Sequence, residues 1–83
     1  MSALEQKFQE AADKARQIQG VSTENKKKLY AYFKQATDGP IGDRKRPGIF
    51  DQVGRAKYDS WAELGELSKE DAMKQYIELV ESL

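Results

Sequence analysis

Two lysines in the middle of this chain lie at helical spacing from aromatic side chains. Tyr30 precedes Phe33 by three residues and Lys34 by four, so the three side chains share one surface if this segment is helical. Lys57 and Trp61 repeat the spacing of four. Lysine binds phosphate as a point charge, and the face of an aromatic ring accepts a flat heterocycle such as adenine. The pattern therefore indicates a site for a flat, phosphorylated ligand.

A structural role for the two lysines remains the alternative, because a lysine stem can run past buried aromatics and hold its ammonium in water. The run Lys26–Lys28 has two interpretations of the same kind, a solvated helix face or attraction to phosphates. Basic grooves lined with aromatic rings also bind single-stranded nucleic acid. The formal net charge of zero argues against that role, and we expect no nucleic-acid partner.

The charges are unevenly distributed along the chain. From Lys26 to Lys57 there are nine basic and three acidic residues, whereas the remainder has five basic and eleven acidic residues. Such segregation predicts an anionic partner for the middle of the chain. Pairing of the acidic ends with the basic middle inside the fold is the alternative explanation.

The composition excludes several classes of site. The 83 residues contain no cysteine and no histidine, so disulfides, zinc sites and Ser-His or Cys-His catalysis are excluded, and no metal site is expected. This length suits one small domain, which we place at residues 1–83. The start, MSALEQKFQE, lacks the basic and then apolar pattern of a signal peptide, and we expect a cytoplasmic protein.

The elements that must position the site are helices, because apolar residues recur at helical spacing and no segment alternates with the period of a strand. We predict helices over 4–18, 22–37, 53–64 and 69–83, with Gly20 and Gly65 at the ends of the first and third. Ser22 or Thr23 is expected to cap the second helix, and Ser68 the fourth. The segment DGPIGDRKRPG, rich in glycine and proline, is predicted to be a long loop.

The apolar faces of the four helices are expected to surround one core. The first helix contributes Leu4, Phe8, Ala11, Ala12, Ala15 and Ile18. The second contributes Leu29, Tyr30, Phe33, Ala36 and Thr37. The third contributes Val53, Ala56, Lys57, Ser60, Trp61 and Leu64. The fourth contributes Ala72, Met73, Tyr76, Ile77, Val80 and Leu83.

Three segments, LYAYFKQATDG, RPGIFDQVGRAKYDSWAEL and SKEDAMKQYIELVESL, resemble the acyl-CoA-binding protein family. The resemblance extends over essentially the whole chain and keeps the family's order of motifs. It implies an all-α fold, a four-helix bundle with up-down-down-up topology, that holds one acyl-CoA in a surface bowl. It also implies binding and transport of the thioester rather than chemistry on it, with no cofactor.

The same resemblance implies individual ligand contacts. Tyr30 and Lys34 match residues that meet the adenine nucleotide, including its ribose 3′-phosphate. Lys57 matches a phosphate ligand, and Tyr76 matches a tyrosine that touches the nucleotide or its ribose. Two residues of the first helix complete the nucleotide end: Arg16, where the family often has lysine, and Ala12, near the adenine.

The chain departs from the family pattern at several positions. Phe33 stands where a second tyrosine is usual, which removes a hydroxyl but keeps a stacking surface. Tyr58 replaces a common tryptophan. Lys26 and Lys27 stand near positions that tend to be apolar and to touch the acyl chain; together with Ala56 they are the predicted acyl-chain seam, which their aliphatic stems can cover.

These observations predict a monomeric intracellular carrier and pool former for medium- to long-chain acyl-CoA, which is not an enzyme. It would make transient contact with membranes or with enzymes that use acyl-CoA. The alternative is a helical protein- or membrane-interaction domain that has lost ligand binding; thioester hydrolysis comes third. The joint presence of Tyr30, Lys34, Lys57 and Tyr76 favours the carrier.

Overall fold

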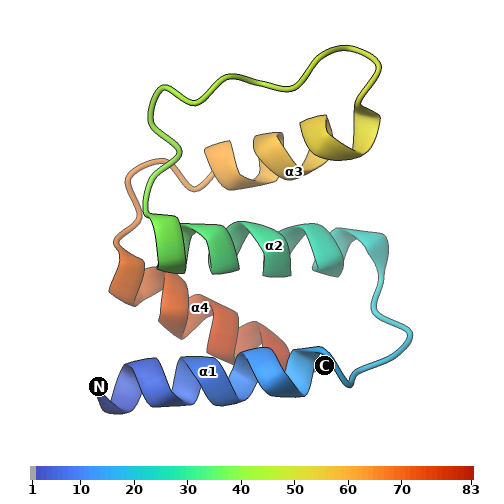
Figure 1. Cartoon of the computed structure of the whole chain (residues 1–83). Coiled ribbons are helices and arrows are strands. Elements are labelled where there is room, and N and C mark those ends of the chain that lie inside the picture. Colours follow the sequence, from blue (N-terminus) through green and yellow to red (C-terminus); the bar gives the residue numbers. More distant parts are fainter. Residues whose placement is uncertain (1) are drawn as a thin grey trace.

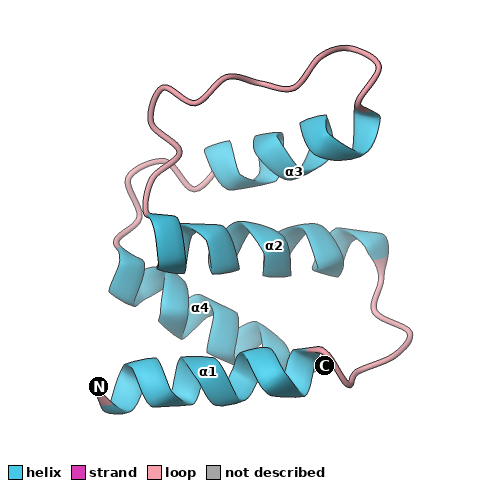
Figure 2. Cartoon of the chain, in the orientation of Figure 1, coloured by secondary structure: helices cyan, strands magenta, loops and turns pink. Residues whose placement is uncertain are grey.

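The computed structural model describes residues 2–83 and contains four helices, with no strand in this part of the chain (Figures 1 and 2). They are α1 (Ala3–Ala15), α2 (Thr23–Asp38), α3 (Gln52–Ala62) and α4 (Lys69–Ser82). Figure 1 shows α2 and α3 running in one direction and α1 and α4 in the other. This is the predicted up-down-down-up, all-α topology. Of the predicted domain, only Met1 lies outside the described residues.

Side-chain caps fix where the helices begin. Ser22, rather than Thr23, caps α2, because its hydroxyl accepts the N–H of Asn25 at 3.1 Å. Ser68 caps α4 as predicted and accepts the N–H of Asp71 at 3.1 Å. Each cap satisfies one of the N–H groups that a first helical turn leaves without a backbone partner.

The predicted ends of the four helices differ from the observed ones by one to three residues; α3 ends at Ala62, two residues before its predicted end, and α4 at Ser82. Helix α1 ends at Ala15 instead of continuing to residue 18, because Gln17 and Ile18 donate to carbonyls only three residues back, which tightens the last turn. Gly20, with a φ of 74°, lies in the bend that follows and not at the helix end. Helix α2 continues one residue beyond its predicted end, to Asp38.

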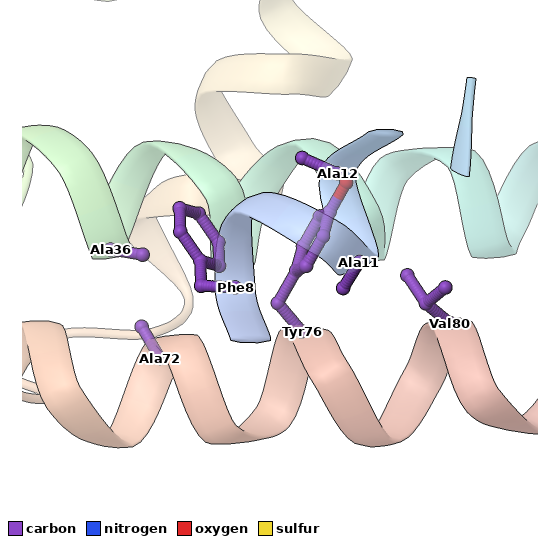
Figure 3. Packing of buried hydrophobic residues seen from close by; sticks show 7 residues of the cluster. All are labelled: Phe8, Ala11, Ala12, Ala36, Ala72, Tyr76 and Val80. Atoms are coloured by element: carbon purple, nitrogen blue, oxygen red, sulfur yellow. The ribbon is translucent and has the colours of Figure 1, made fainter. Parts of the chain in front are cut away.

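The core is formed by three helices rather than four. Its buried members come from α1, α2 and α4: Phe8, Ala11, Ala12, Ala36, Ala72, Tyr76 and Val80 (Figure 3). The Phe8 ring lies at its centre, with centroids 5.5 Å from Phe33 and 5.1 Å from Tyr76. The prediction of one core surrounded by four helices is therefore wrong. Small alanines on all three helices let the backbones approach these rings closely.

Of the three other helices, α3 packs only on α2. Its one buried side chain is Trp61, and Val53, predicted on the apolar face, is 69% exposed. Three other residues of the predicted apolar faces are also exposed. They are Thr37, whose hydroxyl donates to the Phe33 carbonyl at 2.9 Å, Lys57 and Leu83. An apolar face limited to one large side chain explains why α3 remains outside the core.

The loop between α2 and α3 lies along α3 (Figure 1) and is hydrogen-bonded to it. Arg46 makes a two-pronged ion pair with Asp59, with distances of 3.0 and 2.7 Å, which holds the pKa of Asp59 below its ordinary value. Three side chains of α3 donate to loop carbonyls: Arg55 to Pro47, Tyr58 to Arg44 and Trp61 to Gly39. The loop is thus a fixed partner of α3.

Gln35 is completely buried, and the sequence analysis did not identify it. Its Nε2 donates to the carbonyls of Gly65 and Leu67, at 3.0 and 2.8 Å. These bonds attach α2 to the connection between α3 and α4. The position of Gln35 on α2, next to Ala36, is compatible with burial. Glutamine is mostly exposed in proteins, however, so the residue type did not predict a buried side chain.

We expect Gln35→Met to lower the free energy of unfolding by about 1–3 kcal/mol, because it keeps the length of the side chain and leaves two carbonyls without their donor. Urea denaturation followed by circular dichroism measures this change. Gln75→Met is the matched control, because Gln75 is exposed on α4 and should change little. Equal stability of the two variants would show that water replaces the Gln35 donor.

Candidate functional site

A pocket of about 310 Å³ opens between α1, α2 and α4, and we call it the nucleotide pocket after the contact that the sequence predicts for its residues. Its lining consists of Ala12, Ala15, Arg16, Leu29, Tyr30, Phe33 and Tyr76. Five of the seven predicted ligand contacts are in this lining. They come from three helices and from positions far apart in the sequence, and the fold brings them together.

The floor of the nucleotide pocket is aromatic and rigid. The centroids of the Phe33 and Tyr76 rings are 6.0 Å apart, and both rings rest on Phe8. Figure 3 shows the Tyr76 side chain pointing from α4 toward Ala12. Burial raises the pKa of the Tyr76 phenol above its ordinary value, and the charge of Arg16 opposes this shift only in part. The hydroxyl therefore stays protonated at neutral pH and can donate a hydrogen bond.

The rim of the nucleotide pocket carries Arg16, the residue that caps the C-terminal end of α1. Its guanidinium pairs with Asp13 at 2.9 Å, and both side chains are largely exposed. An exposed ion pair of this kind contributes little to stability. The guanidinium can therefore turn to an anionic ligand at low cost.

A second pocket, of about 330 Å³, lies between the N-terminal halves of α2 and α3, and we call it the seam. Its lining contains all three residues predicted to touch the acyl chain, Lys26, Lys27 and Ala56. The other lining residues are Thr23, Tyr30, Gln52, Val53 and Lys57. Its accessible surface is almost entirely apolar despite the lysines, because their stems form the walls. Tyr30 lines the seam and the nucleotide pocket alike.

The lysines pair with aromatic rings across the α2–α3 interface and not along their own helices. The Nζ of Lys57 lies 5.3 Å from the Tyr30 centroid, and the Nζ of Lys34 lies 5.1 Å from the Trp61 centroid. The expected pairs were Tyr30 with Lys34 and Lys57 with Trp61. Helices α2 and α3 run in the same direction. Moving four residues along both helices therefore leads from the pair Tyr30–Lys57 to the pair Lys34–Trp61. Lys57 thus lines the seam and lies over Tyr30, the residue that the two pockets share.

Lys34 belongs to the lining of neither pocket. Its Nζ forms an ion pair with Asp38 at 2.6 Å, and the hydrogen bond in this pair holds the pKa of Asp38 below its ordinary value. Arg44 approaches the same Trp61 ring, with its Cζ 4.8 Å from the centroid. The predicted contact of Lys34 with phosphate stays a prediction, and a phosphate there would compete with the Asp38 carboxylate. The sequence analysis did not identify this competitor.

A larger cavity, about 1070 Å³, which we call the large cavity, lies against α2 and α3 and shares residues with the seam, among them Lys27 and Ala56. Its walls carry charges of both signs, with Lys28 and Arg55 facing the same space as Glu24 and Glu63. Mixed charge does not select an anion. The basic and aromatic residues converge on the two smaller pockets, which are therefore the candidate site.

Comparison with known proteins agrees with this geometry. The sequence model of one family, described as Acyl CoA binding protein, matches residues 5–80. An Acyl-CoA-binding protein homolog of Manduca sexta is 44% identical over 82 residues, which cover 98% of this chain and 91% of that protein. The crystal structure of Oryza sativa Acyl-CoA-Binding Protein 2 superposes with a TM-score of 0.91 at 43% identity, over 96% of this chain and 87% of that one.

Some relatives are longer proteins that carry the name of an enzyme. Enoyl-CoA delta isomerase 2 of Rattus norvegicus is 43% identical over 84 residues, a match that covers this whole chain but 21% of the isomerase. The similarity therefore concerns one part of that longer protein.

Proposed function

This chain belongs to the acyl-CoA-binding protein family, and we propose that it carries medium- to long-chain acyl-CoA thioesters, with the nucleotide in the nucleotide pocket and the acyl chain in the seam. The observation that carries this arrangement is the position of Tyr30. It lines both pockets, and the Lys57 ammonium lies over its ring. A ligand that is anionic at one end and apolar at the other can pass from one pocket to the next at this point.

At the nucleotide end, the rings of Tyr30, Phe33 and Tyr76 offer faces and edges to adenine, and Arg16 stands at the rim. Lys57 supplies positive charge where the phosphates would pass into the seam. Lys34 completes the set once it exchanges Asp38 for the ribose 3′-phosphate. Each charge-assisted bond to phosphate would contribute roughly 1.5–3 kcal/mol.

At the acyl end, the stems of Lys26 and Lys27 and the methyl group of Ala56 would cover methylene groups. Burial of one methylene contributes up to about 0.8 kcal/mol, so affinity should rise with chain length until the seam is filled. The ammonium groups of these lysines stay in water and leave the apolar walls to the chain.

The surroundings of the bound thioester support a carrier rather than a catalyst. The sequence contains no histidine or cysteine, and no carboxylate occurs among the described residues that line the seam. We propose further that the protein works as a cytoplasmic monomer, with residues 1–83 as one binding domain that needs no cofactor. A carrier must collect and deliver its cargo, so transient contact with membranes or with enzymes that use acyl-CoA belongs to this function.

Calorimetric titration with palmitoyl-CoA, octanoyl-CoA, free CoA and palmitate tests the proposal. We expect one-to-one binding of the thioesters and much weaker binding of free CoA and of palmitate, because each of these fills one pocket only. The preferred thioester reports how much chain the seam holds. Equal affinities for free CoA and for both thioesters would exclude the seam as the acyl site.

Asp38→Asn is expected to tighten thioester binding roughly two- to fivefold, because it removes the carboxylate that competes for Lys34 and an exposed ion pair contributes up to about 1 kcal/mol. Glu81→Gln, which makes the same change of charge at an exposed position on α4, is the matched control. A thioester of 3′-dephospho-CoA should not distinguish Asp38→Asn from the original protein. A similar gain with both ligands would indicate a general charge effect.

A further inference from the structure

Three of the four large apolar side chains that are exposed in residues 2–83 lie within five positions of one another. Ile49 is 67% exposed, Phe50 96% and Val53 69%. We call these three residues the apolar tip. Single exposed apolar residues are ordinary, but a group of them on one surface usually marks a contact site. The tip lies at the N-terminal end of α3, where the loop enters the helix (Figure 1).

The backbone holds the apolar tip in a fixed position. The N–H of Asp51 donates to the Gly48 carbonyl at 3.0 Å, which closes a turn around Ile49 and Phe50. The Asp51 side chain in turn accepts the N–H of Gly54 at 2.9 Å and caps α3. Phe50 is thus presented outward by a turn and a helix cap, and it lines none of the cavities described above.

Four lysines share pockets with residues of the apolar tip. Lys26, Lys27 and Lys57 line the seam together with Val53, and Lys28 lines the large cavity together with Ile49. Carboxylates are present as well: Glu24, Asp59 and Glu63 line the large cavity, and Asp51 caps α3. The charge of Asp59 is paired with Arg46, and none of these carboxylates lines the seam. We call these four lysines the basic rim. All four are exposed.

The charges of the whole molecule are separated in a way that agrees with the basic rim. Residues 23–62, which form α2, α3 and their loop, hold nine basic and five acidic residues, and the rest of the chain holds five basic and nine acidic ones. Among the helices α3 contacts only α2, so α3 and its loop lie on the side of α2 that is away from α1 (Figure 1). A charge distribution of this kind turns the positive side toward an anionic surface before contact.

We propose that the apolar tip and the basic rim dock the protein on anionic phospholipid bilayers. An outward-pointing group of apolar side chains ringed by long, flexible cations matches the boundary between acyl chains and charged headgroups, where apolar groups insert and lysines meet phosphate. Val53 belongs to both the tip and the seam, so the seam would open at the membrane surface, where acyl chains enter or leave. This last step rests on the proposed function, whereas the docking does not.

Co-sedimentation with vesicles tests the proposal. The vesicles consist of phosphatidylcholine alone or mixed with phosphatidylserine. We expect the protein to bind the mixed vesicles and not to bind vesicles of phosphatidylcholine alone. Added salt should weaken binding to the mixed vesicles, because it screens the charges of the lysines. Phe50→Ser should weaken vesicle binding roughly tenfold, because an apolar ring no longer inserts. Its melting temperature and its affinity for palmitoyl-CoA in solution should be unchanged.

Leu83→Ser is the matched control, because Leu83 is 40% exposed at the end of α4, outside the tip. Vesicle binding of Phe50→Ser equal to that of the original protein, or equal binding to both kinds of vesicle, would overturn the docking proposal. A protein that binds mixed vesicles through Phe50 but binds no acyl-CoA in solution would sustain the docking and overturn the proposed function instead.

Discussion

Phe8→Ala is expected to lower the free energy of unfolding by about 3–5 kcal/mol, the cost of removing a large side chain from a packed core. Phe8 is 2% exposed, and its ring touches those of Phe33 and Tyr76. Alanines make up most of the remaining core and cannot move in to fill the cavity. Because domains of this kind are stable by only about 5–15 kcal/mol, the loss is a large part of the total.

Guanidinium denaturation monitored by circular dichroism measures the effect. Phe50→Ala is the matched control, since the same substitution at a ring that is 96% exposed should change stability by less than about 0.5 kcal/mol. Similar losses in the two variants would mean that Phe8 is not the centre of the core. The Phe8 variant should also bind acyl-CoA more weakly, because the floor of the nucleotide pocket rests on this ring.

The second large effect is expected at the lysines. Lys57→Ala and Lys34→Ala should each lower the affinity for palmitoyl-CoA roughly 10- to 100-fold, because each would remove one of the proposed charge-assisted contacts with phosphate. The reason differs between the two. Lys57 lies over Tyr30, which lines both pockets, whereas Lys34 must first release Asp38. The loss at Lys34 should therefore be the smaller of the two.

Calorimetry with palmitoyl-CoA and its 3′-dephospho analogue separates these contributions. Lys34→Ala should bind the two ligands with similar affinity if this lysine meets the 3′-phosphate. Lys74→Ala, at an exposed position on α4, controls for the loss of one positive charge. An equal, small decrease in all three variants would point to long-range attraction rather than contact.

The sequence predicted those features of the fold that depend on local signals. Ser68 could be identified as a cap, and Ser22 as one of two candidates, because capping depends on residues only three positions apart. The end of α1 could not be predicted, because the last turn tightens before the glycine that marks the bend. The exclusion of α3 from the core was also missed, because periodicity identifies an apolar face but not the helix against which it packs.

For the candidate site, too, some features could be predicted from the sequence and others could not. The residue types at Tyr30, Lys57 and Tyr76 and the family motifs around them indicated a ligand, and the fold brings Tyr30 and Tyr76 into one pocket. Their pairing could not be predicted, because spacing along one helix says nothing of a parallel neighbour. Asp38 was missed for a related reason. A carboxylate four residues after a lysine is common on exposed helices, so this spacing does not indicate that the carboxylate would compete with a ligand.

Helix α3 is attached to one helix and one loop only. In the protein without ligand, α3 should therefore separate from the rest of the fold more easily than α1, α2 and α4 separate from one another. Separating α3 with its loop from α2 would expose Trp61 but leave the Phe8 core intact, so this opening needs less free energy than global unfolding. Backbone amides of α3 can then exchange with solvent while those of α4 stay protected. A thioester whose chain lies between α2 and α3 stabilises only the closed form, so it strengthens the weakest contact of the fold. The loaded carrier is therefore a more uniformly rigid molecule than the empty one.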